Sequence, residues 1–344
     1  MHDLIVHANY EFLIFEQYVE ECFSGWIHSS YPTNLKTATI KNKEKSKDRT
    51  IPESAQLHRI KTIALLAMVS DDDLMNLLVL KGGNALDLVY KLNGRSSLDL
   101  DFSIEGRISD IDRPVLVEKI MRALVSNFLE NGLVAFDIKF ADRPPEITSD
   151  MESFWGGYRV EFKVVDVKSY EKAGGNIESL RRQSEIVSSH QGRKFYIDIS
   201  RFEYCGGKQP EDVDGYTVYV YTPVMIVIEK LRAICQQMPE YAKVVNNPSR
   251  SARARDFFDI VITLKKFDID FESGENIELL KKIFVAKRVP LNFLGLIRNY
   301  REYHRPDFAS VIATVPSNFT LKEFDFYFDY VADVAEKLKP FWIE

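Results

Sequence analysis

The sequence predicts an α+β protein in which a mixed sheet with flanking helices is followed by a mostly helical C-terminal part. Short apolar or alternating segments, typical of strands, occur between about Leu57 and Thr222. After Pro223 the apolar residues repeat at helical spacing over several segments. With 344 residues, of which 45% are hydrophobic, the chain can bury a sizeable core, and two subdomains are expected.

The N-terminal region, residues 1–56, is expected to lie outside the core that contains the sheet. Residues 9–23 carry apolar side chains at the spacing of a helix that ends near Gly25. Residues 36–52 are predicted to form a linker, whose lysine-rich part, residues 36–49, is predicted to be a loop. Charge runs of this kind are more often simply exposed than in contact with RNA.

The core, residues 57–222, is predicted to combine strands with a few helices. Strands are expected near residues 77–80, 98–102, 133–140, 158–166, 195–200 and 217–221. Helices are expected after Asn84 and near residues 115–129 and 177–188. The remainder, residues 223–344, is expected to be a helical bundle with helices near residues 223–238, 253–266, 277–286, 293–304 and 321–338.

Two aspartates in one predicted strand are the most informative feature of the chain. Successive side chains of a strand face opposite ways, so Asp99 and Asp101 share one face of the segment Leu98–Phe102. Neighbouring carboxylates repel each other, and a divalent cation between them relieves the repulsion. Hard oxygen ligands favour magnesium or manganese over zinc. The alternative for so short a pattern is an acidic strand that faces solvent.

A pair of glycines precedes this strand. Gly82 and Gly83 follow the apolar run 77–80 and allow the backbone to turn sharply and approach a ligand closely. Asn84 is predicted to cap the next helix, whose first N–H groups could meet a phosphate. The spacing of a Walker P-loop is absent, and so is G-x-G-x-x-G, so neither of those nucleotide-binding folds is expected.

Asp198 is the best candidate for a third carboxylate, which an in-line displacement with two metal ions about 3.5–4 Å apart requires. The segment Phe195–Ser200 alternates like a strand, with Ile197 and Ile199 on one side and Asp198 on the other. A neighbouring position in the sheet would bring Asp198 onto the face of Asp99 and Asp101. The competing acids on other predicted strands are Asp137, Glu161 and Asp166.

Together these segments resemble the AbiEii family of nucleotidyltransferase toxins, a branch of the DNA polymerase β-like nucleotidyltransferase superfamily. The matching blocks are Leu80–Leu86 with Arg95–Phe102, Tyr196–Ile199, and Tyr221–Ala233 with Arg253–Asp259. They span about Leu77 to Asp259 in the order of the family. Asn84 stands where the family usually has threonine or another small polar residue. The resemblance implies a minimal polymerase β-like core followed by the helical part.

The resemblance also implies a role for each matching residue. Nucleotide binding is implied for Lys81, Gly82, Gly83, Asn84, Ser97 and Lys230. Catalytic roles are implied for Asp99, Asp101, Asp198, Lys230 and Asp256, of which the first three would bind Mg²⁺ or Mn²⁺. Lys230 lies on a helix opened by Pro223, and Asp256 would order Lys230 or nearby arginines. The alternatives are a solvated lysine and an internal salt-bridge network with no catalytic part.

The implied activity is metal-dependent transfer of a nucleoside monophosphate from an NTP to an RNA, with the tRNA 3′ end as the leading acceptor, in a toxin–antitoxin or phage-defence system. A cognate antitoxin is the implied partner. Transfer to a protein hydroxyl or to a small molecule is the alternative among enzymes. A catalytically idle binding protein is the other alternative, against which the retention of Asp99, Asp101, Lys230 and Asp256 speaks. Base choice depends on a pocket shape that no short motif encodes.

Composition excludes several classes of protein. Cys22, Cys205 and Cys235 lie far apart and the six histidines are scattered, so neither a disulfide framework nor a zinc site is expected. No basic signal region and no membrane-spanning apolar run stand out, which predicts a cytoplasmic protein without membrane contact. The net charge of −6 is unusual for an RNA-binding protein, although basic residues at 181–182, 193–194 and 250–255 flank the proposed site in the sequence.

Overall fold

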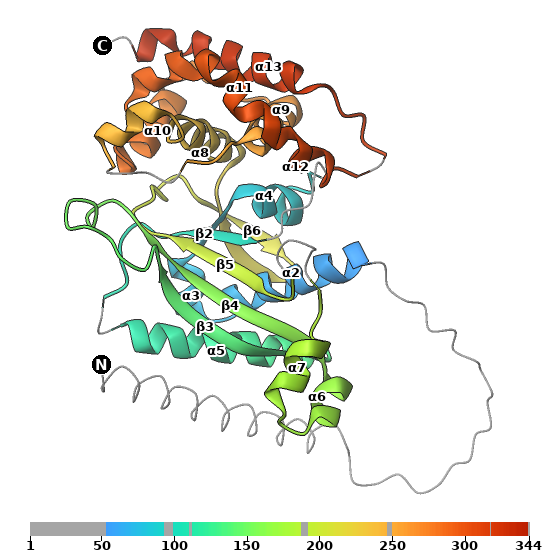
Figure 1. The fold of residues 1–344 in the computed structure, drawn as a ribbon. Coiled ribbons are helices and arrows are strands. Elements are labelled where there is room, and N and C mark those ends of the chain that lie inside the picture. Colours follow the sequence, from blue (N-terminus) through green and yellow to red (C-terminus); the bar gives the residue numbers. More distant parts are fainter. Residues whose placement is uncertain are drawn as a thin grey trace, which may run out of the picture.

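The computed structural model shows a seven-stranded mixed sheet with helices on either side (Figure 1). The described residues are 53–92, 99–109, 112–186, 192–245, 250–316 and 318–342. The predictions for residues 9–23, for the lysine-rich residues 36–49 and for Ser97 lie outside them. The observed sheet, flanking helices and C-terminal helices confirm the predicted fold class.

Two helices that were not predicted lead into the sheet. α2 spans Glu53–Val69, so the boundary predicted between residues 56 and 57 falls inside this helix. α3 spans Asp72–Leu77 and is capped by Asp71, whose carboxylate accepts hydrogen bonds from the backbone N–H groups of residues 73 and 74. Leu78 then connects α3 to the first strand. The apolar run 77–80, predicted as a strand, therefore contains the last residue of α3 and the first two residues of the strand.

The strands have the order β3-β4-β5-β2-β1-β7-β6. Their bounds are β1 Val79–Lys81, β2 Leu100–Ser103, β3 Leu133–Arg143, β4 Gly157–Asp166, β5 Phe195–Ser200, β6 Gln209–Val213 and β7 Tyr216–Val220. The edge strand β6 was not predicted, because it contains Pro210 and two acidic residues. Proline is tolerated at a sheet edge, and the turn Asp214–Gly215, with positive φ at both residues, joins β6 to β7 as a hairpin.

The two central strands carry the predicted acidic residues. β2 pairs with β5 in parallel, and the register places Asp198 directly beside Asp101. On its other side β2 pairs with β1 in the antiparallel direction, with Lys81 opposite Asp101. Ile197 and Ile199 are fully buried on the opposite face of β5. The predicted adjacency of the two acidic strands is therefore confirmed.

The helical segment after β1 differs from the prediction. α4 spans Gly82–Asn84 and continues into a π-helical turn, η1, at Ala85–Val89. Because the helical segment already begins at Gly82, Asn84 lies inside it in the right-handed helical region and makes no side-chain capping hydrogen bond. The prediction that Asn84 caps this helix is wrong, and its amide instead contacts the backbone of the D-x-D segment, as described below.

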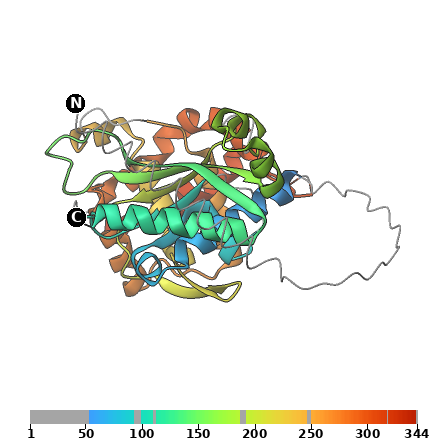
Figure 2. The same cartoon turned by 90° about the horizontal axis from the view of Figure 1, so that it is seen from below.

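The remaining helices lie in two groups. α5 (Arg113–Glu130) packs against β3 on the side of the sheet away from the C-terminal helices (Figure 2). Two short helices, α6 (Val167–Ala173) and α7 (Ile177–Gln183), follow β4. The C-terminal helices gather above the sheet in Figure 1, and the longer ones are α8 Pro223–Cys235, α9 Ala254–Lys266, α10 Gly274–Ala286 and α13 Phe324–Lys337.

Shorter helical segments connect these C-terminal helices. They are η2 Pro239–Lys243, η3 Leu291–Tyr300, α11 Arg301–His304, η4 Arg305–Asp307, α12 Phe308–Ile312 and η5 Lys339–Phe341. The helix predicted at residues 293–304 is thus mainly a 3₁₀ segment. One cluster of buried side chains extends from α2 to α13, across the boundary predicted at residues 222/223. Among the described residues, no helix combines the length and the apolar character that crossing a membrane requires.

Candidate active site

A cavity of about 560 Å³ opens above the D-x-D segment. Most of the predicted site residues line it, namely Lys81, Gly82, Gly83, Asp99, Asp101, Lys230 and Asp256. They come from β1, α4, β2, α8 and α9, which meet where the C-terminal helices lie over the sheet (Figure 1). Arg253 and Arg255, at the start of α9, add two guanidinium groups to the same cavity. The cavity therefore combines carboxylates, cations and glycine backbone.

Gly82 needs to be glycine for two separate reasons. Its φ of +68° lies in the left-handed region, which residues with a Cβ seldom adopt. In addition, a Cβ added at this position would lie 3.1 Å from Oδ2 of Asp101. The turn after β1 therefore brings the backbone next to the Asp101 carboxylate, where a side chain would crowd the acidic centre.

Asn84 contacts the backbone of the acidic segment. Its side chain is fully buried, and its amide nitrogen donates a hydrogen bond to the backbone oxygen of Asp99. Its amide oxygen faces Lys61, whose Nζ lies 3.4 Å away and also forms an ion pair with Asp87 at 3.2 Å. The amide thus contacts protein atoms on both sides. Lys61 was not predicted, since a lysine inside a helix carries no local signal of this role.

Asp101 is held in an unusually acidic environment. Burial raises the pKa of its carboxyl to about 7; Lys81 opposes this rise, and the negative charges of Asp198 and Asp99 add to it. Lys81 is buried, and its Nζ donates to Ser200 Oγ at 3.1 Å and to Glu203 Oε1 at 3.2 Å. The surroundings therefore neutralise the carboxylates only in part, which is the condition that a bound cation would relieve.

Arginine side chains hold the carboxylate of Asp198. Arg159 Nε and a terminal nitrogen donate to its two oxygens at 2.7 and 2.6 Å. Arg143 approaches the same carboxylate at 3.2 Å. Burial raises the pKa of Asp198, and Arg159 opposes that rise. Two arginines therefore already occupy the oxygens of Asp198.

The competing acids on other strands form contacts away from the D-x-D segment. Asp137 contacts Lys163 and Arg181, Glu161 pairs with Lys194 at 2.8 Å, and Asp166 caps α6 through Ser169. None of the three lines the cavity above the D-x-D segment or the neighbouring cavity of about 650 Å³, whereas Asp198 lines the neighbouring one. The ranking of Asp198 ahead of them agrees with its place beside Asp101.

Lys230 is buried in an ion-pair cluster on the helical side of the cavity. Its Nζ lies 2.8 Å from Asp256 Oδ1 and 2.7 Å from Asp259 Oδ2, and Lys230 is only 4% exposed. The alternative of an ordinary solvated lysine is therefore wrong. Asp256 lines the cavity and has Arg253 at 3.5 Å, whereas Asp259 is buried behind it. The structure brings Lys230 together with Asp256 and with Asp259, one turn further along the same helix.

A second charge cluster, which the sequence did not reveal, lies beneath Lys81. Glu203 is buried among Lys81, Lys287 and Arg232, with distances of 3.2, 3.6 and 3.5 Å. Burial opposes ionisation of Glu203, but Arg232, Lys287 and Lys81 outweigh it and lower its pKa to about 2. The partners lie far apart in the sequence, so no local motif could have indicated the cluster.

The donor set at the D-x-D segment fits a divalent cation. Asp99 and Asp101 offer hard carboxylate oxygens, and the pKa of Asp101 is raised mainly by burial, with the negative charges of Asp198 and Asp99 adding to the rise. Among the residues placed by the structure, no group of three or more histidine, cysteine, aspartate or glutamate side chains is arranged to hold a metal ion. Asp198 does not complete such a group here, since Arg159 and Arg143 hold its oxygens.

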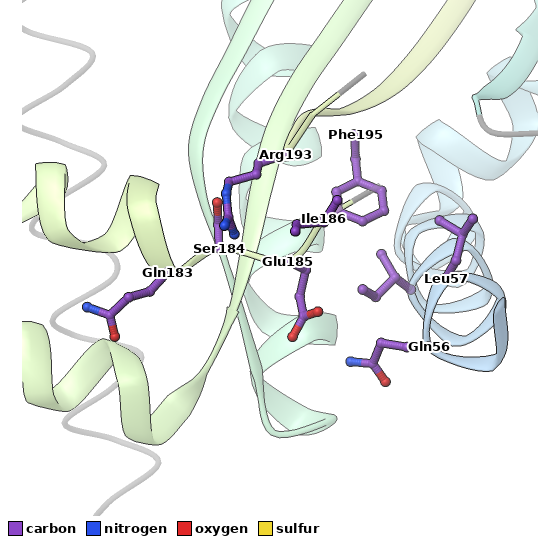
Figure 3. Close-up of a pocket in the computed structure, with 9 residues that line it drawn as sticks. Gln56, Leu57, Gln183, Ser184, Glu185, Ile186, Arg193 and Phe195 are labelled. Carbon is purple, nitrogen blue, oxygen red and sulfur yellow. The ribbon is translucent and has the colours of Figure 1, made fainter. Parts of the chain in front are cut away.

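Two further cavities bear on the site in different ways. One of about 650 Å³ shares Lys81, Asp101 and Glu229 with the first cavity and continues towards Asp198 and β4. Another, of about 440 Å³, lies apart from the acidic centre between α2, the end of α7 and β5 (Figure 3). Its labelled residues include Gln56, Glu185 and Phe195, and no predicted site residue lines it. The predicted site residues that line a cavity therefore do so at the first two.

Comparison with known proteins places these features in a family. Residues 63–330 match the family described as nucleotidyl transferase AbiEii toxin, type IV TA system. This match covers more than half of the chain and includes both acidic strands, Lys230 and Asp256. No curated protein matches the sequence.

Solved structures show a weaker overall similarity. JHP933 from Helicobacter pylori is 17% identical, with 84% of this chain and 95% of that chain covered and a TM-score of 0.46. MenT4, a nucleotidyltransferase toxin from Mycobacterium tuberculosis, is 15% identical, with 83% and 85% covered and a TM-score of 0.47. These scores are too low to support an argument, so the assignment rests on the family match. The chain belongs to the AbiEii nucleotidyltransferase toxin family of type IV toxin–antitoxin systems.

Proposed function

We propose that this protein is a metal-dependent toxin that transfers a nucleoside monophosphate from an NTP to the 3′ end of an RNA, with tRNA as the leading acceptor. One observation supports the proposal most strongly. Two carboxylates that lie two residues apart on one segment, those of Asp99 and Asp101, face a cavity. The other walls of this cavity carry the paired glycines and cationic side chains. That combination suits a nucleotide triphosphate with its metal ion.

The triphosphate is proposed to lie on the β1 side of the acidic centre. Gly82 and Gly83 present backbone to the cavity, and Lys230, Arg253 and Arg255 present positive charge from the helices opposite. Asp256 holds the Lys230 ammonium in place from the cavity side. Lys81, Asn84 and Ser97, the other residues implied in nucleotide binding, keep that proposed role. Lys81 lines the cavity, Asn84 is buried against the backbone of Asp99 and does not line it, and Ser97 lies outside the described residues.

Mg²⁺ or Mn²⁺, when bound, would neutralise charge on the phosphates and on the attacking oxygen. Asp99 and Asp101 are the residues proposed to hold it. Asp198 remains the third proposed ligand, and it must exchange contacts with Arg159 and Arg143 for that role. In the transfer, the acceptor oxygen bonds to the α-phosphorus, the bond to the bridging oxygen breaks, pyrophosphate leaves with that electron pair, and the hydroxyl proton passes to water.

The toxin–antitoxin context adds a partner. Membership of a type IV toxin family supports a cognate antitoxin as the proposed regulator of this chain. The proposed substrates, NTP and tRNA, both occur in the cytoplasm, where we propose the protein acts.

A transfer assay tests the proposal. The purified full-length protein is incubated with Mg²⁺, total tRNA and each α-labelled NTP in turn, and RNA and protein are resolved on denaturing gels. We expect label on RNA that disappears in the Asp99→Ala/Asp101→Ala variant. Label on protein alone would favour a protein hydroxyl as acceptor. No label with any NTP would favour a small-molecule acceptor or an idle binding protein.

A further inference from the structure

The cavity of about 650 Å³ lies on the opposite side of the acidic centre from the glycines. It shares Lys81, Asp101 and Glu229 with the first cavity, but it continues over Asp198 on β5 and towards the start of β4. The strand order β4-β5-β2-β1 thus places this second cavity and the paired glycines on the two sides of β2. In-line displacement requires the attacking and leaving oxygens on opposite sides of phosphorus.

We propose that the second cavity receives the terminal nucleotide of a single-stranded RNA acceptor, and that the Trp155 ring stacks on its base. This inference rests on the proposed function and assigns the two substrates to two different cavities. Trp155 is half-buried and lines the second cavity but not the first. An aromatic ring beside cationic side chains is the usual means of holding an unpaired base without reading its sequence.

The backbone around Trp155 fixes its position. Gly156 has a φ of +101°, and a Cβ there would lie 2.4 Å from Arg201 and from Ile147. A Cβ on Gly157 would lie 2.4 Å from the backbone oxygen of Ile199 on β5. The two glycines therefore allow the backbone immediately after Trp155 to lie close to β5 and to Arg201, the residue that follows β5. The backbone oxygen of Trp155 also accepts a hydrogen bond from Arg201 at 3.2 Å.

Cationic groups surround the second cavity at positions suited to a phosphate backbone. Arg143 lines this cavity but not the first, and its side chain is 52% exposed while it contacts Asp198. Arg253, whose side chain is 40% exposed, lines both cavities at the wall that they share, and Lys287 lines the second. The cavity therefore offers an aromatic ring and exposed positive charge next to the carboxylates, although the net charge of the whole chain is −6. This local charge suits RNA better than a small cationic acceptor.

The experiment distinguishes the effect of the aromatic ring of Trp155 from the effect of an apolar side chain at this position. Trp155→Leu keeps an apolar side chain but removes the ring, whereas Trp155→Phe keeps a ring. Tyr216→Ala, on the exposed face of β7, is the matched control because Tyr216 lines neither cavity. The probe is a short single-stranded RNA oligonucleotide with a free 3′ hydroxyl and a 5′ fluorophore, whose Kd is measured by anisotropy at one fixed salt concentration.

We expect Trp155→Leu to raise the Kd for the oligonucleotide at least about fivefold, the lower end of one lost base stack. Trp155→Phe and Tyr216→Ala should stay within about twofold of the wild type, and the thermal shift produced by Mg²⁺ with NTP should be the same in all four proteins. An unchanged Kd for Trp155→Leu, equal losses of RNA and NTP binding, or no RNA binding by the wild type would each overturn the assignment. Binding through Trp155 without label transfer to RNA would contradict only the proposed function.

Discussion

At the scale of single residues, the acidic centre lowers the stability of the folded state. Asp101 has the carboxylates of Asp99 and Asp198 as neighbours, and its pKa is raised to about 7 by burial and by these charges. Lys81 compensates only in part. Charged groups that a fold does not need are seldom kept in such surroundings. The metal ion proposed above would, when bound, neutralise these charges.

The first prediction concerns Asp101→Asn. Above pH 7 the wild-type carboxyl is ionised at a cost to the folded state, so its removal should raise the free energy of unfolding by about 1 to 3 kcal/mol. The same change should abolish nucleotidyl transfer. Urea unfolding at pH 8 without divalent metal, beside the transfer assay, measures both effects. A variant that is less stable than the wild type would contradict this account of the site.

At the scale of elements, alternation in the sequence was enough to find the two acidic strands but not all of their surroundings. β2 and β5 have buried residues on one face and carboxylates on the other, so both the strands and their shared face could be predicted. The start of α4 could not, because the prediction relied on the capping preference of Asn84, and its amide is used on Asp99 instead. β6 was missed because edge strands tolerate proline and charge.

The second prediction uses two glycines with nearly equal backbone geometry. Gly82 and Gly132 have φ values of +68° and +72°, so either change to alanine should cost about 1 to 2 kcal/mol of stability through backbone strain. Only at Gly82 would the new methyl group also lie 3.1 Å from Asp101, since nothing lies within 4 Å at Gly132. Gly82→Ala should therefore reduce transfer at least about tenfold.

Gly132→Ala is the matched control for backbone strain. It should show a similar loss of stability with transfer rates close to those of the wild type, measured at a temperature where both variants are folded. Equal losses of activity in the two variants would mean that strain alone, and not the crowding of Asp101, accounts for the effect.

At the scale of the whole molecule, the site exists only where the sheet and the C-terminal helices meet. The sheet and the start of α4 supply the aspartates and glycines, and the C-terminal helices supply Lys230 and Asp256. The aspartates and glycines could be predicted from local patterns in the sequence, and Lys230 and Asp256 from the resemblance. The cluster around Glu203 could not be predicted, because it joins Lys81, Arg232 and Lys287 from distant segments. Buried ion pairs of this kind are set by packing and leave no periodic signal.

The third prediction is that Glu203 makes stability depend on acid pH. Its pKa falls from 4.5 to about 2 on folding, so the folded state binds fewer protons than the unfolded state between these values. The resulting contribution of about 3 kcal/mol is complete above pH 4.5 and is lost as the pH falls towards 2. Glu203→Gln should thus destabilise the protein at pH 7 by about this amount, and the difference should shrink below pH 4.5.

Denaturant unfolding of wild type and Glu203→Gln at several pH values measures this effect. Glu240→Gln is the comparison variant outside the cluster: the hydrogen bond from Tyr300 lowers the pKa of Glu240, so this variant should show the same direction of pH dependence but a smaller effect than Glu203→Gln. A difference between wild type and Glu203→Gln that stays constant from pH 7 to pH 2.5 would contradict the assigned role of Glu203.

The central claim is that the protein transfers the nucleoside monophosphate of an NTP, and that this reaction takes place in the cavity above Asp99 and Asp101. The most direct measurement compares α-labelled and γ-labelled NTP with tRNA and Mg²⁺, using the wild type and Asp101→Asn. The account predicts that the α-label enters RNA, that the γ-label appears only in pyrophosphate, and that the variant transfers neither. Transfer of the γ-label to the acceptor, or undiminished α-label transfer by Asp101→Asn, would contradict it.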